Sequence, residues 1–185
     1  MSTTKLHTVE DLMALADADR YELIEGELVE VSPSGGKSSV IAVLISSMIF
    51  GFVRERGLGY VTGEAGGYIL GSDPDTVVAP DVGFVQKARY PNGLPDRGFL
   101  DVPPDLAVEV LSPTDEPGDI RRKQRLYEQA MFPCVWWVDP QKQTVTVRRP
   151  RVAPVTLVRG DDLDGGDILP GFRLPVSDIF EGLLA

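Results

Sequence analysis

The chain of 185 residues is poor in histidine and cysteine, which excludes several classes of chemistry. Its one histidine, His7, lies near the start, so histidine-rich zinc sites, histidine-based nucleases and Ser-His-Asp hydrolases lack their usual reagent. Its one cysteine, Cys134, cannot form a disulfide within the chain, which predicts a reducing, cytoplasmic location. Catalysis would therefore have to use carboxylates, lysine, tyrosine or a metal ion bound by oxygen.

The sequence also lacks a long hydrophobic run. The most apolar window, residues 40–53, is shorter than the roughly 20 residues that a membrane span needs and contains two serines and a glycine. The first twenty residues contain acids and no long apolar segment, so they do not resemble a signal peptide. We expect no membrane association, while 43% hydrophobic residues predict a sizeable folded core.

Positive charge is scarce as well. The net charge of -10 argues against a general nucleic-acid binder. The charge is unevenly spread, because residues 119–151 hold 8 Lys/Arg against 3 Asp/Glu. We call this segment the basic island, and we expect any DNA binding to depend on its arginines: Arg121, Arg122, Arg125, Arg148, Arg149 and Arg151.

The order of predicted elements indicates an α/β fold with a central mixed sheet and helices packed on it. Periodicity and turn residues predict helices at 8–18, 39–55 and 118–132, the last with Asp119 as N-cap, a hairpin at 20–33, and strands at 59–70, 76–86, 105–112 and within 134–149. We expect one domain over residues 1–185. Its parts are an N-terminal helix and hairpin (8–33), a core (39–149), and C-terminal strands and turns (150–185).

The segment "VVAPDVGFVQ", residues 77–86, has the composition of a buried strand but contains an aspartate, Asp81. Burying a carboxylate without a partner costs several kcal/mol, so either the strand ends there or Asp81 has a partner. Its neighbours on the same strand face, Ala79 and Gly83, are small and leave room for another group to approach. A second strand, "DLAVEVLS", carries Glu109 in the same kind of setting.

If these two strands are adjacent, Asp81 and Glu109 can converge on one oxygen-bound cation. Mg²⁺ is typically held by one or two carboxylates and recruits substrate phosphate. The alternatives are two strand-end acids that face solvent, or salt bridges from the acids to the basic helix that follows.

The predicted helix after Glu109 presents two different faces. At 100° per residue its inward stripe is Ile120, Lys123, Tyr127, Ala130 and Met131, while Arg121, Arg122 and Arg125 lie on the opposite face. Lys123 is then either a lysine that snorkels from an apolar stripe, or a fixed ammonium beside the two carboxylates that stabilises phosphoryl charge.

These residues resemble the core of the PD-(D/E)XK, restriction-endonuclease-like superfamily, with Asp81 preceded by Pro80 and Glu109 in an apolar strand. Within it, the chain is similar to the large bacterial family classed as restriction endonucleases. The resemblance runs in family order from about residue 8 to the C-terminus, through "YELIEGELVEVSPSG", "PDVGFV", "PDLAVEVLSPTD", "KQRLYEQA", "VWWVDP" and "LPGFRLPVSDIF".

The resemblance implies a three-layer nuclease core that hydrolyses DNA phosphodiester bonds with a divalent metal, Mg²⁺ or Mn²⁺. It places the metal on Asp81 and Glu109, with Val110 in the same ligand set. Glu22 matches a recurrent family acid and is either a third site carboxylate or an exposed strand residue. The lysine usually found two residues after the glutamate is absent here, and Lys123 from the following helix stands at the matching position.

A second departure from the family pattern concerns a histidine that often follows the "SPSG" loop. This chain has Gly36, Lys37, Ser38 and Ser39 there instead. Three functions therefore stay open: a metal-dependent deoxyribonuclease, a catalytically degenerate binding or assembly module of the same fold, and a metal-assisted hydrolase of another phosphorylated substrate.

The segment Val135, Trp136 and Trp137 places large apolar groups on both faces of one strand. Both faces must be covered, by the chain's own core or by a partner. Together with the family resemblance and the single-domain size, this favours a homodimer.

Overall fold

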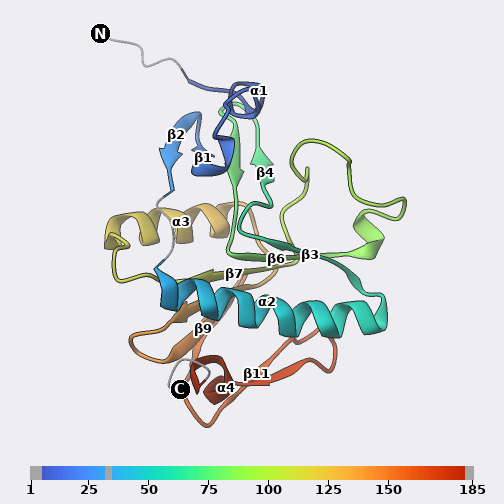
Figure 1. Cartoon of the computed structure of the whole chain (residues 1–185), viewed down its shortest axis with the longest axis vertical. Helices are drawn as coiled ribbons and strands as arrows, with labels where there is room; N and C mark the ends of the chain where they lie inside the picture. Colours follow the sequence, from blue (N-terminus) through green and yellow to red (C-terminus); the bar gives the residue numbers. More distant parts are fainter. Residues whose placement is uncertain (1–5, 32–34, 182–185) are drawn as a thin grey trace.

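The computed structural model describes residues 6–31 and 35–181, and it has the α/β architecture expected from the sequence (Figure 1). Residues 32–34 of the expected loop lie outside the described residues. In chain order the elements are α1 (Val9–Met13), η1 (Ala18–Arg20), β1 (Tyr21–Ile24), β2 (Glu27–Glu30), α2 (Gly36–Arg56), β3 (Gly59–Gly63), β4 (Tyr68–Gly71), β5 (Thr76–Val78), β6 (Val82–Gln86), η2 (Lys87–Arg89), β7 (Leu106–Val110), α3 (Pro117–Gln129), β8 (Val135–Asp139), β9 (Thr144–Arg149), β10 (Val152–Leu157), β11 (Asp162–Asp164), β12 (Arg173–Pro175) and α4 (Val176–Glu181).

The strands form a large central sheet and two smaller ones. The central sheet has six strands in the order β10-β9-β8-β7-β6-β3, and only its β7–β8 pair is parallel. A four-stranded sheet has the order β2-β1-β5-β4, and β11 pairs with β12. The central mixed sheet therefore joins strands from the expected core to β10 from the C-terminal segment, while the N-terminal hairpin pairs with β5.

Helices cover both faces of the central sheet, with α2 on one side and α3 on the other (Figure 1). Successive side chains of β8 point to opposite faces of the sheet and contribute to both layers of the core. Trp136 packs with α2, whereas Val135 and Trp137 pack with α3. All three side chains are at most 5% exposed. The chain's own core thus covers both faces of β8, and these residues give no indication of a partner.

Two segments expected as single strands each break and pass from one sheet to the other. Residues 59–70 divide into β3 and β4, and residues 76–86 divide into β5 and β6, with β3 and β6 in the central sheet and β4 and β5 in the smaller one. Pro80 stands at the second break, where it has no N–H to donate to a strand ladder. Asp81 therefore lies between two strands, not inside one.

The helix ends confirm the capping predicted for α1 and correct the N-cap predicted for α3. At α1, Thr8 and Asp11 form the expected capping box. Asp119 is not the N-cap of α3, since the helix begins two residues earlier, with Glu116 as N-cap and Pro117 in the first turn. Proline is favoured there because the first helical N–H groups have no intrahelical acceptor.

Helix α2 is longer than the window from which no membrane span was expected. It has 21 residues, with a mean hydropathy of 1.7 over its most apolar part, so by length and composition alone it could cross a bilayer. Only 28% of that part is buried. One such helix does not by itself indicate a membrane protein, because core helices also have this composition. Here Ile41, Ile45 and Ile49 pack one face of α2 against the central sheet.

The space beside Gly83 is filled by the protein itself. A Cβ at this position would lie 2.2 Å from the Tyr68 hydroxyl oxygen and 2.7 Å from Thr62 Oγ1. The two hydroxyls are hydrogen-bonded at 2.7 Å, and burial raises the pKa of Tyr68 to about 12. The small residue therefore leaves room for another group to approach, and that group is a tyrosine from β4.

Replacing Gly83 by alanine should lower the free energy of unfolding by about 1–3 kcal/mol, because the added methyl overlaps the Tyr68 hydroxyl. Urea denaturation measures the change. The matched control is Gly118→Ala in α3, where no atom lies within 4 Å of the new methyl, so stability should hold or rise. Combining Gly83→Ala with Tyr68→Phe should recover part of the loss, and no recovery would show that the clash is not the cause.

Candidate active site

Five side chains from four parts of the fold meet where the two larger sheets join. Glu22 comes from β1, Asp81 from the break between β5 and β6, Glu109 from β7, and Lys123 and Tyr127 from α3. We call these five residues the junction cluster. Glu22 and Glu109 are both buried, at 6% and 7% exposure.

Strand pairing places Asp81 beside Glu109. In the antiparallel β6–β7 ladder Val82 faces Val108, so the residue before β6 faces the residue after Val108. Asp81 Oδ2 accepts a hydrogen bond of 2.6 Å from the backbone N–H of Val110. The break at Pro80 allows the aspartate to turn onto the neighbouring strand, which answers the question raised by its position: it is both at a strand end and partnered.

Lys123 links the two glutamates. Its ammonium nitrogen lies 3.1 Å from Glu22 Oε1 and 3.0 Å from Glu109 Oε1. Tyr127, one helical turn further along α3, donates a short hydrogen bond to Glu109. Glu22 in turn accepts a bond of 2.9 Å from the backbone N–H of Ala79, which ties the small sheet to the strand break.

The cluster holds more negative than positive charge. It has three carboxyl groups, and Lys123 is the only cation within ion-pair distance of them among the described residues. Burial, together with repulsion from Asp81 and Glu22, raises the pKa of Glu109 to about 7, although Lys123 and Tyr127 oppose the shift. Glu109 therefore exchanges its proton near neutral pH.

Lys123 is a permanent cation in this setting. Burial works against its charge, but the attraction of Glu109 and Glu22 is stronger and raises its pKa above the usual value. It cannot act as a base near neutral pH. The pKa of Asp81 is also raised, first by burial, with the Val110 N–H and Lys123 working in the opposite direction.

The carboxylate oxygens of the cluster are suitable ligands for a hard divalent cation, for which water and substrate would supply most of the remaining ligands. Across residues 6–31 and 35–181, no group of three or more His, Cys, Asp or Glu side chains forms a metal site. Asp81 and Glu109 nevertheless supply two carboxylates, which is a usual protein share for Mg²⁺. The surplus of buried negative charge is the feature that a cation would offset.

Of the three α3 arginines expected to bind DNA, two are exposed as predicted and one is paired. Arg121 and Arg125 are exposed, as expected for the outer face of α3. Arg122 is half-buried, and its Nη2 lies 3.1 Å from Glu27 Oε2 on β2. The α3 stripe placed Lys123 inward and these arginines outward, but it could not show that the N-terminal hairpin would lie against Arg122.

Sequence reasoning assigned no role to Tyr127, although it placed this residue on the inward stripe of α3. Its burial raises its pKa well above the usual value, and the charges of Glu109 and Glu22 add to the effect. The phenol therefore stays protonated and donates to Glu109. Its spacing of four residues from Lys123 was the available signal.

Comparison with known proteins agrees with this geometry. The profile of the Uma2 family, described as "Putative restriction endonuclease", matches residues 9–177. The chain belongs to this family. The match spans the whole junction cluster and confirms the restriction-endonuclease-like resemblance drawn from the sequence motifs.

A solved structure shares the fold of this chain. It is the crystal structure of a putative nuclease belonging to DUF820 from Anabaena variabilis, with a TM-score of 0.81 and 22% sequence identity. The alignment covers 95% of this chain and 98% of the other. At this identity the likeness establishes the fold alone. No functionally curated protein matches the chain significantly.

The raised pKa of Glu109 predicts how stability depends on pH. Between about pH 4.5 and 7 the folded protein keeps a proton on Glu109 that the unfolded chain has released. Since the folded state binds more protons, rising pH lowers the free energy of unfolding across this window. Relative to Glu109→Gln, which cannot titrate, the wild type should therefore lose stability from pH 4.5 to 7.

Urea denaturation in EDTA at several pH values measures this difference. The matched control is Glu55→Gln at an exposed position, whose difference from the wild type should stay nearly constant across the window. A constant difference for Glu109→Gln would show that Glu109 titrates normally.

Proposed function

We propose that this protein is a metal-dependent DNA endonuclease that hydrolyses phosphodiester bonds at the junction cluster. The observation that carries the proposal is the meeting of Asp81, Glu109 and a permanently charged Lys123 in a chain of this family. DNA as the substrate class follows from the family. The metal and the residue roles are part of the proposal.

In this proposal Asp81 and Glu109 hold Mg²⁺ or Mn²⁺ through carboxylate oxygens, and Val110 contributes its backbone oxygen. When bound, such an ion polarises a phosphate oxygen and lowers the pKa of water. Glu109 must release its proton to act as a ligand, and its pKa of about 7 places that step near neutral pH. Tyr127 holds the Glu109 carboxylate in a fixed orientation through its hydrogen bond.

Lys123 stabilises negative charge that develops on the phosphate in the transition state. A fixed ammonium in a partly dry site needs no reorganisation during the reaction, which makes it effective. Its two carboxylate contacts hold it in place, and one of them, Glu22, is also bonded to the strand break beside Asp81. Glu22 is thus a positioning residue in this proposal.

The arginines of the basic island are proposed to bind the DNA backbone. Arg121 and Arg125 are exposed and can reach phosphate directly, whereas Arg122 would first have to leave Glu27. With few such contacts in a chain of net charge -10, binding should be weak and salt-sensitive, with a log-log slope of about -0.9 per phosphate contact.

One observation favours the alternative of a catalytically degenerate binding module. The Glu109 carboxylate already accepts bonds from Lys123 and Tyr127, so the protein itself partly satisfies a ligand that the metal needs. A module that keeps its acids for stability would have this arrangement. Metal binding and cleavage measured on the same variants separate the two functions.

Replacing both Asp81 and Glu109 by alanine should abolish Mg²⁺ or Mn²⁺ binding in calorimetry and abolish cleavage of plasmid DNA. Lys123→Ala should keep metal binding but reduce cleavage by about 10²-fold or more, because it removes a transition-state charge. The control is Lys142→Ala, an exposed lysine paired with Asp139. A wild type that binds neither metal nor DNA would make the binding or assembly module the better interpretation.

We further propose a homodimer, formed through the exposed side of α2. Residues 38–53 contain no charged side chain, and the outer stripe of this helix exposes Val40, Val43 and Phe50 by 50% or more. Exposed apolar patches of this kind usually mark an interaction site. A single apolar stripe can pair with its own copy across a two-fold axis, as most homodimers do.

Light scattering at micromolar concentration should give the mass of a dimer for the wild type and of a monomer for Val43→Glu. The control is Val158→Glu, another valine that is 50% exposed, and it should stay dimeric. A wild-type monomer would reject the dimer. Flotation of the wild type, but not of Val43→Glu, with neutral phospholipid vesicles would assign the stripe to a membrane surface instead.

A further inference from the structure

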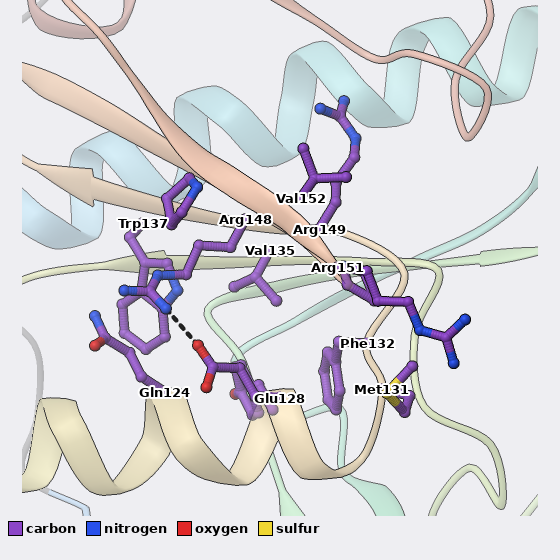
Figure 2. A pocket seen from close by; sticks show the side chains of 13 residues that line it. Gln124, Glu128, Met131, Phe132, Val135, Trp137, Arg148, Arg149, Arg151 and Val152 are labelled. Carbon is purple, nitrogen blue, oxygen red and sulfur yellow. Dashed lines mark hydrogen bonds and ion pairs between the residues drawn. The ribbon is translucent and has the colours of Figure 1, made fainter.

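A pocket of about 350 Å³ lies on the far side of Tyr127 from the junction cluster. The second half of α3, the start of β8 and the β9–β10 hairpin form its walls (Figure 2). Its volume is within the range of about 300–1,000 Å³ that is typical of small-ligand sites. The proposed function uses Tyr127 of its lining to orient Glu109 and the basic-island arginines to contact the DNA backbone, but it assigns no ligand to the cavity itself.

The floor of the pocket is aromatic and apolar. Tyr127 and Phe132 stack with ring centroids 4.1 Å apart, and Trp137 lies against Tyr127 at 6.0 Å. These three rings and Val135 are each at most 5% exposed, so the floor is set by the core and is already formed. A planar group placed against it would gain apolar contact with the ring atoms that border the pocket.

The rim of the pocket is positively charged. Arg148 reaches toward Glu128 on one side, and Arg151 extends past Met131 on the other (Figure 2). Glu128 is the single acid in the lining, and Arg148 pairs with it. Within the described part of the chain Arg151 forms no ion pair, so the pocket keeps a net positive charge suited to an anion.

The pocket lining also contains unsatisfied donors and a turn residue with positive φ. Trp137 Nε1 and Arg148 Nε are buried donors without a hydrogen-bond partner among the described residues, a state that costs about 1–3 kcal/mol per group. Arg151 has φ of 62° in the turn between β9 and β10, a conformation that favours glycine or asparagine. Both donors belong to residues that line the pocket, so a ligand with acceptor oxygens bound there would lie close to unsatisfied N–H groups.

We propose that this pocket binds one nucleotide, with its base on the aromatic floor and its phosphate between Arg148 and Arg151. The nucleotide is either a unit of a DNA strand or a free nucleotide, which share this chemistry. As a subsite for DNA the proposal rests on the proposed nuclease function, whereas binding of a free nucleotide stands independently. Because the Tyr127 ring forms the floor and its hydroxyl holds Glu109, a bound nucleotide would directly contact the side chain that orients a catalytic carboxylate.

The test uses the full chain in EDTA, so that no metal at the junction cluster contributes. Calorimetry, with tryptophan fluorescence as a second readout of Trp137, measures binding of dAMP, dTMP, a single-stranded oligonucleotide, inorganic phosphate and deoxyadenosine. We expect saturable binding of the nucleotides, and much weaker binding of phosphate or nucleoside alone. Tighter binding of the oligonucleotide would identify a DNA strand as the source, and equal binding a free nucleotide.

Arg151→Gly should weaken nucleotide binding by about tenfold or more, the effect of one charge-assisted hydrogen bond. Glycine suits the positive φ, so this variant should fold at least as well as the wild type. Arg151→Lys should restore most of the affinity. The matched control, Arg173→Gly, removes an exposed arginine from β12 and should bind like the wild type.

Each of three results would overturn the proposal. These are the absence of saturable nucleotide binding, equal affinity in Arg151→Gly and the wild type, and binding of inorganic phosphate as tight as that of a nucleotide. Asp81→Ala separates it from the nuclease function, because this variant should lose cleavage and keep nucleotide binding. A wild type that binds nucleotides but never cleaves DNA refutes the nuclease proposal alone. One that cleaves DNA without Arg151-sensitive binding refutes the pocket alone.

Discussion

The packing of two buried carboxyl groups and a third, half-buried one around a single ammonium is the constraint on which the rest of this structure depends. Lys123 makes contacts with Glu22 and Glu109 that join α3 to strands of both larger sheets. Removing one partner of a buried ion pair typically costs about 3–5 kcal/mol, so the helix, the hairpin and the central sheet are held in one arrangement. Burial, with repulsion from Asp81 and Glu22, raises the pKa of Glu109 to about 7, and the attraction of Glu109 and Glu22 keeps Lys123 charged.

This constraint can be met only because two strand pairs cross from one sheet to the other. Pro80 interrupts the ladder, and the break presents the Ala79 N–H to Glu22 and the Asp81 carboxylate to β7. In an uninterrupted strand, the Ala79 N–H and the Asp81 carboxylate would not be free to make their bonds with Glu22 and Val110. Next to the break, the Tyr68 and Thr62 hydroxyls fill the space that Gly83 leaves.

Tyr127 contacts both the junction cluster and the pocket. Its hydroxyl donates to Glu109 in the junction cluster, and its ring forms part of the pocket floor with Phe132 and Trp137. A side chain that is buried from both directions transmits a displacement on one side to the other, since packed interiors have little room to absorb it. If the pocket binds a nucleotide as proposed, the ligand and Glu109 contact the same side chain.

The sequence by itself determined the fold class, the family, the inward direction of Lys123 and the capping of α1, because these depend on local periodicity and motif order. Tertiary structure decided the rest. The strand breaks depend on which sheet each half joins. The covering of Trp136 and Trp137 depends on the chain's own helices, and the pairing of Arg122 depends on a hairpin that is distant in sequence. The pocket arises from contacts between α3 and the β9–β10 hairpin, and the bond of Tyr127 from contact between α3 and β7. Local periodicity predicts which residues of α3 point inward, but not what they meet there.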